Sequence, residues 1–137
     1  MKEILLVEAD KERIAGVISN LLSNAVKFTK EGEIFVSTEK KNDNNNDHSY
    51  ALVTVKDTGP GIDPEILPKI FSKFITKSFE GLGLGLYISK NVVEAHGGKI
   101  WSENINNNNK NGNLGAIFYF TLPIINSNNS SNNNIDK

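Results

Sequence analysis

Two asparagines and a lysine in the first third of the chain have a spacing that fits cation and phosphate chemistry. Asn20, Asn24 and Lys27 share one face of a helix, because each residue advances the helix by about 100°. Amide oxygens can coordinate a hard cation such as Mg²⁺ without adding charge, and an ammonium group can bind a phosphate. The alternative interpretation is a set of satisfied polar positions at the edge of a helix.

A second candidate begins at Asp57, which ends a β-prone run and starts the turn Asp-Thr-Gly-Pro-Gly-Ile (57–62). A carboxylate at this place can accept a hydrogen bond from an exocyclic amine, and the glycines allow the backbone to approach a flat ligand closely. The alternative is that Asp57 only starts a β-turn, which aspartate often does.

Glycines at alternate positions mark a third candidate, Gly-Leu-Gly-Leu-Gly-Leu (81–86), which leads into a helical pattern. The usual reason for such glycines is that backbone N–H groups at a helix N-terminus bind phosphate. The spacing is neither the dinucleotide fingerprint nor the Walker A loop, so a flexible hinge is the alternative. The segment before it, 71–80, mixes phenylalanine with polar residues and predicts a lid, although Phe71 and Phe74 fit a core equally well.

Periodicity predicts the elements that must position these candidates. Apolar residues spaced by threes and fours indicate a helix over 11–28, with Asp10 as its N-cap. The pattern as a whole predicts an α+β domain over 1–124, with a mixed, mostly antiparallel sheet and helices on one face. The other predicted elements are two strands joined by a long loop (33–39 and 50–56), a short helix (64–72), a second helix (84–95) and three further β-prone runs (3–8, 98–103 and 115–122).

Composition limits the function classes. The 137 residues carry 15 basic and 16 acidic side chains, so the basic excess typical of nucleic-acid binding is missing. Cysteine is absent, which removes disulfides, thiolate zinc sites and thiol catalysis. No stretch resembles a signal-peptide core or a membrane span, so we expect a cytoplasmic protein without membrane contact. Asparagine clumps at 42–46, 104–113 and 126–134 predict two surface loops and a disordered tail over 125–137, without a chemical role.

The order of the candidates resembles the catalytic ATP-binding domain of two-component sensor histidine kinases, within the gyrase–Hsp90–histidine kinase–MutL superfamily. Asn-Leu-Leu-Ser-Asn-Ala-Val-Lys-Phe-Thr (20–29) resembles the N box, and Asp-Thr-Gly-Pro-Gly-Ile (57–62) resembles the G1 box. Ile-Phe-Ser-Lys-Phe (70–74) resembles the F box, and the glycine run (81–86) resembles the G2 box. The resemblance covers about residues 3–124 and implies the Bergerat-type α/β sandwich, with ATP held between a helical layer and a lid.

The resemblance also implies roles for individual residues. Asn20, Asn24 and Lys27 would act in catalysis, the asparagines by holding Mg²⁺ at the phosphates and the lysine by contacting a phosphate. Leu82 departs from the family, which usually has threonine there, and the lid is short. The implied contacts to ATP are Asp57 to the adenine amino group, Phe28, Gly59, Gly61, Ile62 and Phe71 around the base, and Lys77, Gly81, Gly83, Leu84, Gly85 and Leu86 around the phosphates.

The implied activity is transfer of the γ-phosphoryl group of ATP to a histidine on a separate dimerisation domain, with a response regulator downstream. Neither His48 nor His96 resembles the acceptor, so we expect the acceptor in another domain or chain, and the isolated domain as a monomer. Asn20 stands where the ATPase branches of the superfamily carry a glutamate base. Because a carboxamide cannot accept a proton, Asn20 favours a kinase over a gyrase-like ATPase. The alternative is a nucleotide-binding regulatory module without phosphotransfer.

Overall fold

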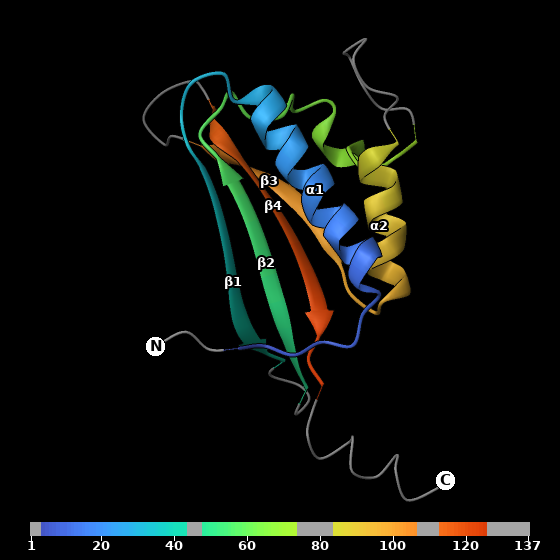
Figure 1. Cartoon of the computed structure of the whole chain (residues 1–137). Coiled ribbons are helices and arrows are strands. Elements are labelled where there is room, and N and C mark those ends of the chain that lie inside the picture. The colour runs from blue at the N-terminus through green and yellow to red at the C-terminus, as the bar shows by residue number, and fades with distance from the viewer. Residues whose placement is uncertain (1–3, 44–47, 74–83, 107–112, 126–137) are drawn as a thin grey trace, which may run out of the picture.

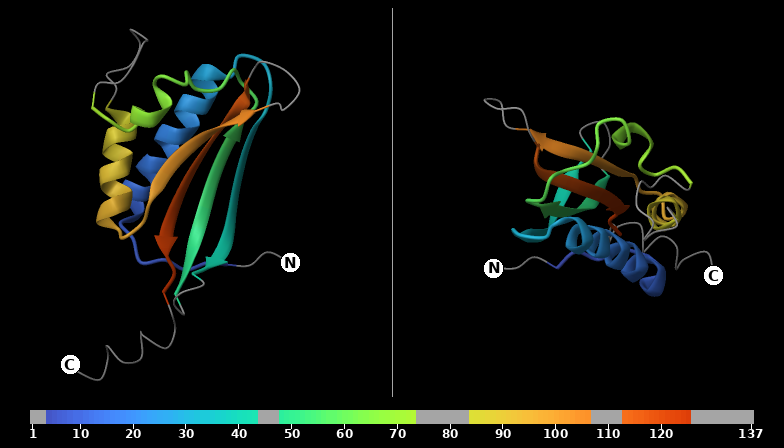
Figure 2. Two further views of the ribbon diagram at one scale, coloured as in Figure 1. Left: turned by 180° about the vertical axis from the view of Figure 1, so that it is seen from behind. Right: turned by 90° about the horizontal axis from the view of Figure 1, so that it is seen from above.

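Two helices cover one face of a four-stranded antiparallel sheet in this computed structural model (Figures 1 and 2). This arrangement confirms the predicted α+β sandwich with helices on one face. The structure describes residues 4–43, 48–73, 84–106 and 113–125. The elements are α1 (Lys11–Phe28), β1 (Ile34–Asn42), β2 (Ser49–Asp57), a 3-10 turn (Leu67–Lys69), α2 (Gly85–Ala95), β3 (Ile100–Asn106) and β4 (Asn113–Pro123).

Three sequence expectations differ from the structure in detail. The β-prone run 3–8 contributes only an isolated bridge, between Val7 and Ile124. The short helix expected over 64–72 is a single 3-10 turn, because Pro68 has no N–H to donate to an α-helical bond. All strand pairs among the described residues are antiparallel, so the sheet is not mixed. The expected tail and lid fall largely on 126–137 and 74–83, which lie outside the described residues.

The strand order β1-β2-β4-β3 decides which loops meet at the end of the sheet. Asp57, the last residue of β2, pairs with Ile34 on β1 and with Ala116 on β4. The start of β4 and the turn that follows β2 therefore lie together. Figure 1 places the C-terminal end of α1 and the segment that follows β2 at this same end of the molecule.

Helix α1 begins at a capped residue and buries one stripe. The Asp10 carboxylate accepts hydrogen bonds from the backbone N–H groups of Glu12 (3.1 Å) and Arg13 (3.2 Å), as expected of an N-cap. Its buried residues recur every four positions, at Val17, Leu21 and Ala25. This stripe fixes the rotation of α1 on the sheet, and it places the neighbouring polar face at the edge of the core.

The core lies between this stripe and the covered face of the sheet. Phe120 of β4, Leu21 of α1 and Val93 of α2 are fully buried, and each such side chain contributes about 1.5–3 kcal/mol relative to exposure. The buried side chains of the core cluster are Val17, Leu21, Ala25, Val53, Val55, Val93, Ala116, Phe118, Phe120 and Leu122.

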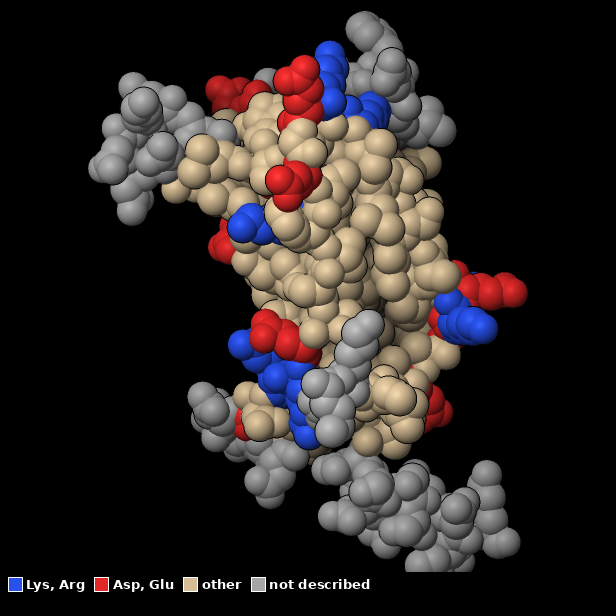
Figure 3. Space-filling view, turned by 60° about the vertical axis from the view of Figure 1, so that its left-hand side comes forward, with Lys and Arg blue, Asp and Glu red and all other residues tan. Residues whose placement is uncertain are grey.

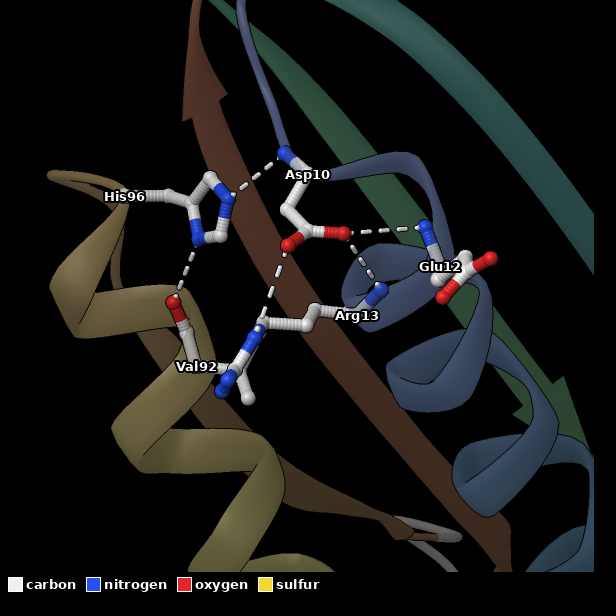
Figure 4. A network of polar contacts seen from close by, with 5 residues as sticks. All are labelled: Asp10, Glu12, Arg13, Val92 and His96. Atoms are coloured by element: carbon white, nitrogen blue, oxygen red, sulfur yellow. Dashed lines mark hydrogen bonds and ion pairs between the residues drawn. The ribbon is translucent and has the colours of Figure 1, made fainter.

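His96, at the end of α2, ties the two helices together (Figure 4). Its Nε2 accepts a hydrogen bond from the backbone N–H of Asp10 at 3.0 Å, so Nε2 carries no proton. Its Nδ1 lies 2.7 Å from the carbonyl oxygen of Val92, an atom that only accepts, so Nδ1 carries the hydrogen. Both ring nitrogens of His96 are thus used in contacts, one within the end of α2 and one to the start of α1.

The uncovered face of the sheet carries an aromatic pair at β3 and β4. Trp101 stacks on Tyr119 with ring centroids 5.1 Å apart, and the Tyr119 hydroxyl donates to Glu103. Burial, the hydrogen bond and the negative charge of Glu103 raise the pKa of Tyr119 to about 12. Tyr119 therefore stays protonated at neutral pH.

The side of the molecule next to β1 is poor in charge. In Figure 3 the charged side chains lie mainly toward the two ends of this face, and its middle is uncharged. Val26 of α1 and Val36 of β1 remain 64% and 50% exposed, because the helices pack on β2, β3 and β4.

Neither helix of the described residues is long and apolar enough to cross a membrane.

Candidate functional site

Asp57 is a buried carboxylate at the end of β2, with only 5% of its surface exposed. Its Oδ1 accepts hydrogen bonds from the N–H of Gly59 at 2.9 Å and from the N–H of Ala116 at 3.3 Å. No other described residue donates to this carboxylate, so Oδ2 keeps its acceptor capacity. A buried carboxylate is costly unless its oxygens are satisfied, and this arrangement leaves one oxygen for a donor on a ligand.

Gly59 closes the space between Asp57 and the end of α1. A Cβ atom built on Gly59 would lie 2.9 Å from Thr29 Oγ1, 3.1 Å from the Phe28 carbonyl oxygen and 3.2 Å from Asp57 Oδ1. These contacts are too close for any side chain at this position. Gly59 thus allows a close approach within the chain, and its predicted approach to a ligand stays a prediction.

Thr29 adds an unsatisfied group to the same place. Its Oγ1 is buried and has no hydrogen-bond partner among the described residues. An unpaired buried hydroxyl costs about 1–3 kcal/mol, so a water or ligand that reaches it would recover that energy. Asp57 and Thr29 thus both flank Gly59 with unused hydrogen-bonding capacity, and a flat base with a donor and an acceptor on one edge fits this pair. Sequence reasoning placed Thr29 in the N box but gave it no role.

Asn104 holds the turn that follows Asp57. Its amide is paired twice with the backbone of Ile62: Oδ1 accepts from the Ile62 N–H and Nδ2 donates to the Ile62 carbonyl oxygen, both at 2.7 Å. Gly61, beside it, has a φ of 82°, which favours glycine. Asn104 was expected in a surface loop without a role. It lies instead in β3, which extends into the asparagine clump that was predicted to be a loop.

Asn20, Asn24 and Lys27 lie along the edge of the buried stripe of α1, and all three are partly buried. Asn20 donates from Nδ2 to the Gly85 carbonyl oxygen (3.3 Å) and to Ser89 Oγ (3.1 Å), so it contacts α2. Lys27 lies over the Phe28 ring, with Nζ 5.4 Å from its centroid. The described residues include no cluster of three or more His, Cys, Asp or Glu for a metal, so amide oxygens are the candidate cation ligands.

The remaining expected residues fall into two groups. The rings of Phe71 and Phe118 are nearly perpendicular, with centroids 6.2 Å apart, so the partly buried Phe71 packs against the core. Leu84 precedes the first turn of α2, Gly85 begins it, and no side chain of the described residues caps its first N–H groups. Lys77, Gly81 and Gly83 lie outside the described residues.

The described residues also line a hollow of about 560 Å³ along α1. Its lining includes Lys27 but none of the other expected site residues, and it contains no carboxylate. The buried Asp57 with its free oxygen is therefore the stronger candidate for ligand recognition. The lining residues of the hollow are Ala15, Ile18, Ser19, Leu22, Ser23, Val26 and Lys27.

Comparisons with known proteins identify the class of protein that has this architecture. Residues 9–126 match the family described as histidine kinase-, DNA gyrase B- and HSP90-like ATPase. Because this match covers most of the sequence, the chain belongs to that family. The resemblance to histidine kinase catalytic domains that the boxes indicated is confirmed by the relatives and structures that follow.

Two curated relatives are sensor kinases. Sensor protein KdpD of Clostridium acetobutylicum is 40% identical over 131 residues, and sensor histidine kinase WalK of Bacillus subtilis is 36% identical over 125 residues. The matches cover 89% and 87% of this chain but only 13% and 19% of those proteins, so the chain spans less than a fifth of either.

Two solved structures share the fold at a TM-score of 0.71. The catalytic domain of histidine kinase ThkA, in a nucleotide-free form, is 39% identical; the match covers 89% of this chain and 73% of that one. Full-length ShkA in complex with AMPPNP is 28% identical, with 90% of this chain and 24% of that one covered. The fold of this chain is therefore that of histidine kinase catalytic domains.

We predict that Gly59→Ala lowers the free energy of unfolding by about 1–3 kcal/mol, because the new Cβ overpacks the space shared by Thr29 and Asp57. Gly16→Ala is the matched control: Gly16 lies inside α1 with open space around its Cβ position, and alanine there should stabilise by about 1 kcal/mol. Chemical denaturation measures both changes. Equal stabilisation by the two substitutions would contradict the close packing at Gly59.

Asn104→Ala should lower the free energy of unfolding by about 1–3 kcal/mol, since it leaves the N–H and C=O of Ile62 without their partner. Asn106→Ala, at an exposed position of the same strand, should change it by no more than about 0.5 kcal/mol. Denaturation midpoints of the two variants compare them directly. Similar midpoints would show that Asn104 does not hold the turn.

Proposed function

We propose that the chain is the ATP–Mg²⁺-binding catalytic domain of a sensor histidine kinase, which transfers the γ-phosphoryl group of ATP to a histidine outside these residues. The observation that carries the proposal is the buried Asp57, whose Oδ1 is fixed by two backbone N–H groups while Oδ2 remains available. The adenine amino group is the donor that we assign to Oδ2. The Thr29 hydroxyl, on the other side of Gly59, fits the ring nitrogen beside that amino group, directly or through a water.

The phosphates would extend from this pocket toward the polar edge of α1 and the start of α2. Asn20 and Asn24 would hold Mg²⁺, which supplies charge neutralisation at the phosphates when bound. Lys27 would contact a phosphate, and the free N–H groups at the start of α2 would add hydrogen bonds. The contacts that we propose for the remaining residues are Phe28, Gly61, Ile62 and Phe71 near the base, and Lys77, Gly81, Gly83, Leu84, Gly85 and Leu86 near the phosphates.

The proposed reaction breaks the bond between the γ-phosphorus and the β–γ bridging oxygen and forms a bond to an imidazole nitrogen, with ADP as the leaving group. The residues of this chain contribute by positioning ATP and neutralising charge. The acceptor histidine would come from a dimerisation domain, in a longer chain or in trans, and the phosphoryl group would pass to a response regulator. We propose a cytoplasmic location and a monomeric isolated domain.

Binding of AMPPNP, measured by calorimetry with and without Mg²⁺, tests the pocket. Asp57→Asn keeps an oxygen for the Gly59 and Ala116 N–H groups but replaces the free oxygen by a donor, so affinity should fall about 10–100-fold. Glu39→Gln removes a carboxylate that pairs with Lys41 on the exposed strand β1, and it should bind like the wild type. Wild-type binding that is unchanged in Asp57→Asn would overturn the proposed site.

Phosphotransfer is tested in the same preparation. With γ-labelled ATP and a histidine-bearing dimerisation domain from a sensor kinase, label should appear on that domain and not on this chain. Nucleotide binding without transfer to any such domain would indicate a regulatory module, and fast hydrolysis without a partner would indicate a gyrase-like ATPase.

A further inference from the structure

Ser89 is a buried polar residue to which neither the sequence motifs nor the comparisons give a role. It lies on α2 with none of its surface exposed, and together with Asp57 it makes up the buried polar residues of the described part of the chain. Its Oγ accepts a hydrogen bond from Nδ2 of Asn20 at 3.1 Å. The partner of Ser89 is thus one of the two asparagines proposed to hold Mg²⁺.

The orientation of the Asn20 amide is fixed by what surrounds its nitrogen. Nδ2 also lies 3.3 Å from the carbonyl oxygen of Gly85, which accepts but cannot donate. Both hydrogens of the amide nitrogen are therefore used on α2, one by Gly85 and one by Ser89. The amide oxygen then lies on the other side of the side chain, and no described residue donates to it.

We infer that Ser89 is a positioning residue for the metal site: the Gly85 carbonyl oxygen, which only accepts, sets Nδ2 toward α2, and the Ser89 hydroxyl holds the Asn20 side chain in the position that presents Oδ1 to the cation. The inference rests on the proposed function, because it assigns the cation to Asn20. An asparagine amide has two orientations of the same shape, and only the orientation with oxygen toward the cation can bind it. Residues that orient a ligand typically change metal affinity about 10–100-fold when they are lost.

The Asn20 amide needs the hydroxyl of Ser89 to hold it in place, because its hydrogen bond to the Gly85 carbonyl oxygen is long. At 3.3 Å it lies beyond the usual N–H···O distance of about 2.7–3.2 Å, so it holds the amide weakly. With alanine at position 89, the amide would keep only this weak bond, and the Asn20 side chain would leave the position that presents Oδ1 to the cation for part of the time. The same two bonds join α1 to the first two turns of α2.

The test is Ser89→Ala, with Ser102→Ala as the matched control. Ser102 is a half-buried serine of β3 whose Oγ donates to the Ile117 carbonyl oxygen at 3.0 Å, so its loss removes a similar bond elsewhere in the sheet. The first measurement needs no ligand: nuclear magnetic resonance of the Asn20 side-chain amide. Both Nδ2 hydrogens should exchange slowly with water in the wild type and in Ser102→Ala, and at least one should exchange faster in Ser89→Ala.

The second measurement is the ratio of AMPPNP affinities with and without Mg²⁺. Ser89→Ala should lower this ratio about tenfold while the affinity without Mg²⁺ stays at the wild-type value, and Ser102→Ala should leave the ratio unchanged. Asn20→Ala should lower the ratio as well, and adding Ser89→Ala to it should have no further effect, because both act through one amide.

Unchanged exchange of the Asn20 amide in Ser89→Ala, or an unchanged Mg²⁺ ratio, would overturn the inference while leaving nucleotide binding by this chain in place. An equal loss in Ser102→Ala would assign the effect to general stability and overturn it too. A wild-type chain whose AMPPNP affinity does not depend on Mg²⁺ would instead contradict the proposed metal site, and with it any role of Ser89 there.

Discussion

The burial of one carboxylate constrains the structure around the site. Asp57 is almost fully enclosed, and the N–H groups of Gly59 and Ala116 satisfy one of its two carboxylate oxygens. For this to happen β2 and β4 must pair up to their shared end, and the chain must turn tightly after Asp57. The close approach of Gly59 to Thr29 and Phe28 then brings the end of α1 to the same place. Strand pairing, the turn and the helix end are thus fixed together.

One face of helix α1 packs in the core, and the face next to it carries the asparagines of the proposed site. The stripe of Val17, Leu21 and Ala25 determines how the helix sits on the sheet. Asn20 is thereby held against α2, where its two hydrogen bonds to Gly85 and Ser89 join the helices near one end of α2, while His96 joins α2 to Asp10 at the other end. Helix α2 is therefore held at both of its ends, and the proposed phosphate side of the site lies at the end where Asn20 makes the connection.

Much of this arrangement was predictable from the sequence, for identifiable reasons. The 3.6-residue period and the Asp10 cap predicted the observed bounds of α1. The boxes pointed to Asp57, Gly59 and Asn20, whose contacts the structure describes and whose roles toward a ligand stay predictions. Tertiary partners were not predictable, because they depend on register: Asn104 was hidden in an asparagine clump, although it pairs with Ile62 across 42 positions. Ser89 carried no sequence signal, and Thr29 lay in the N box without one for its hydroxyl, since a serine in a helix or a threonine at its end is ordinary.

Residue-level mapping of the bound nucleotide tests most directly the central claim, that the base is recognised at Asp57. In a titration of isotope-labelled chain with AMPPNP and Mg²⁺, followed by nuclear magnetic resonance, the backbone amides of Gly59 and Ala116 should shift most, because both donate to the Asp57 carboxylate. Shifts are also expected at the side-chain amides of Asn20 and Asn24. Shifts confined to the hollow along α1, at Ala15, Leu22 and Val26, with Gly59 and Ala116 unchanged, would contradict recognition of the base at Asp57.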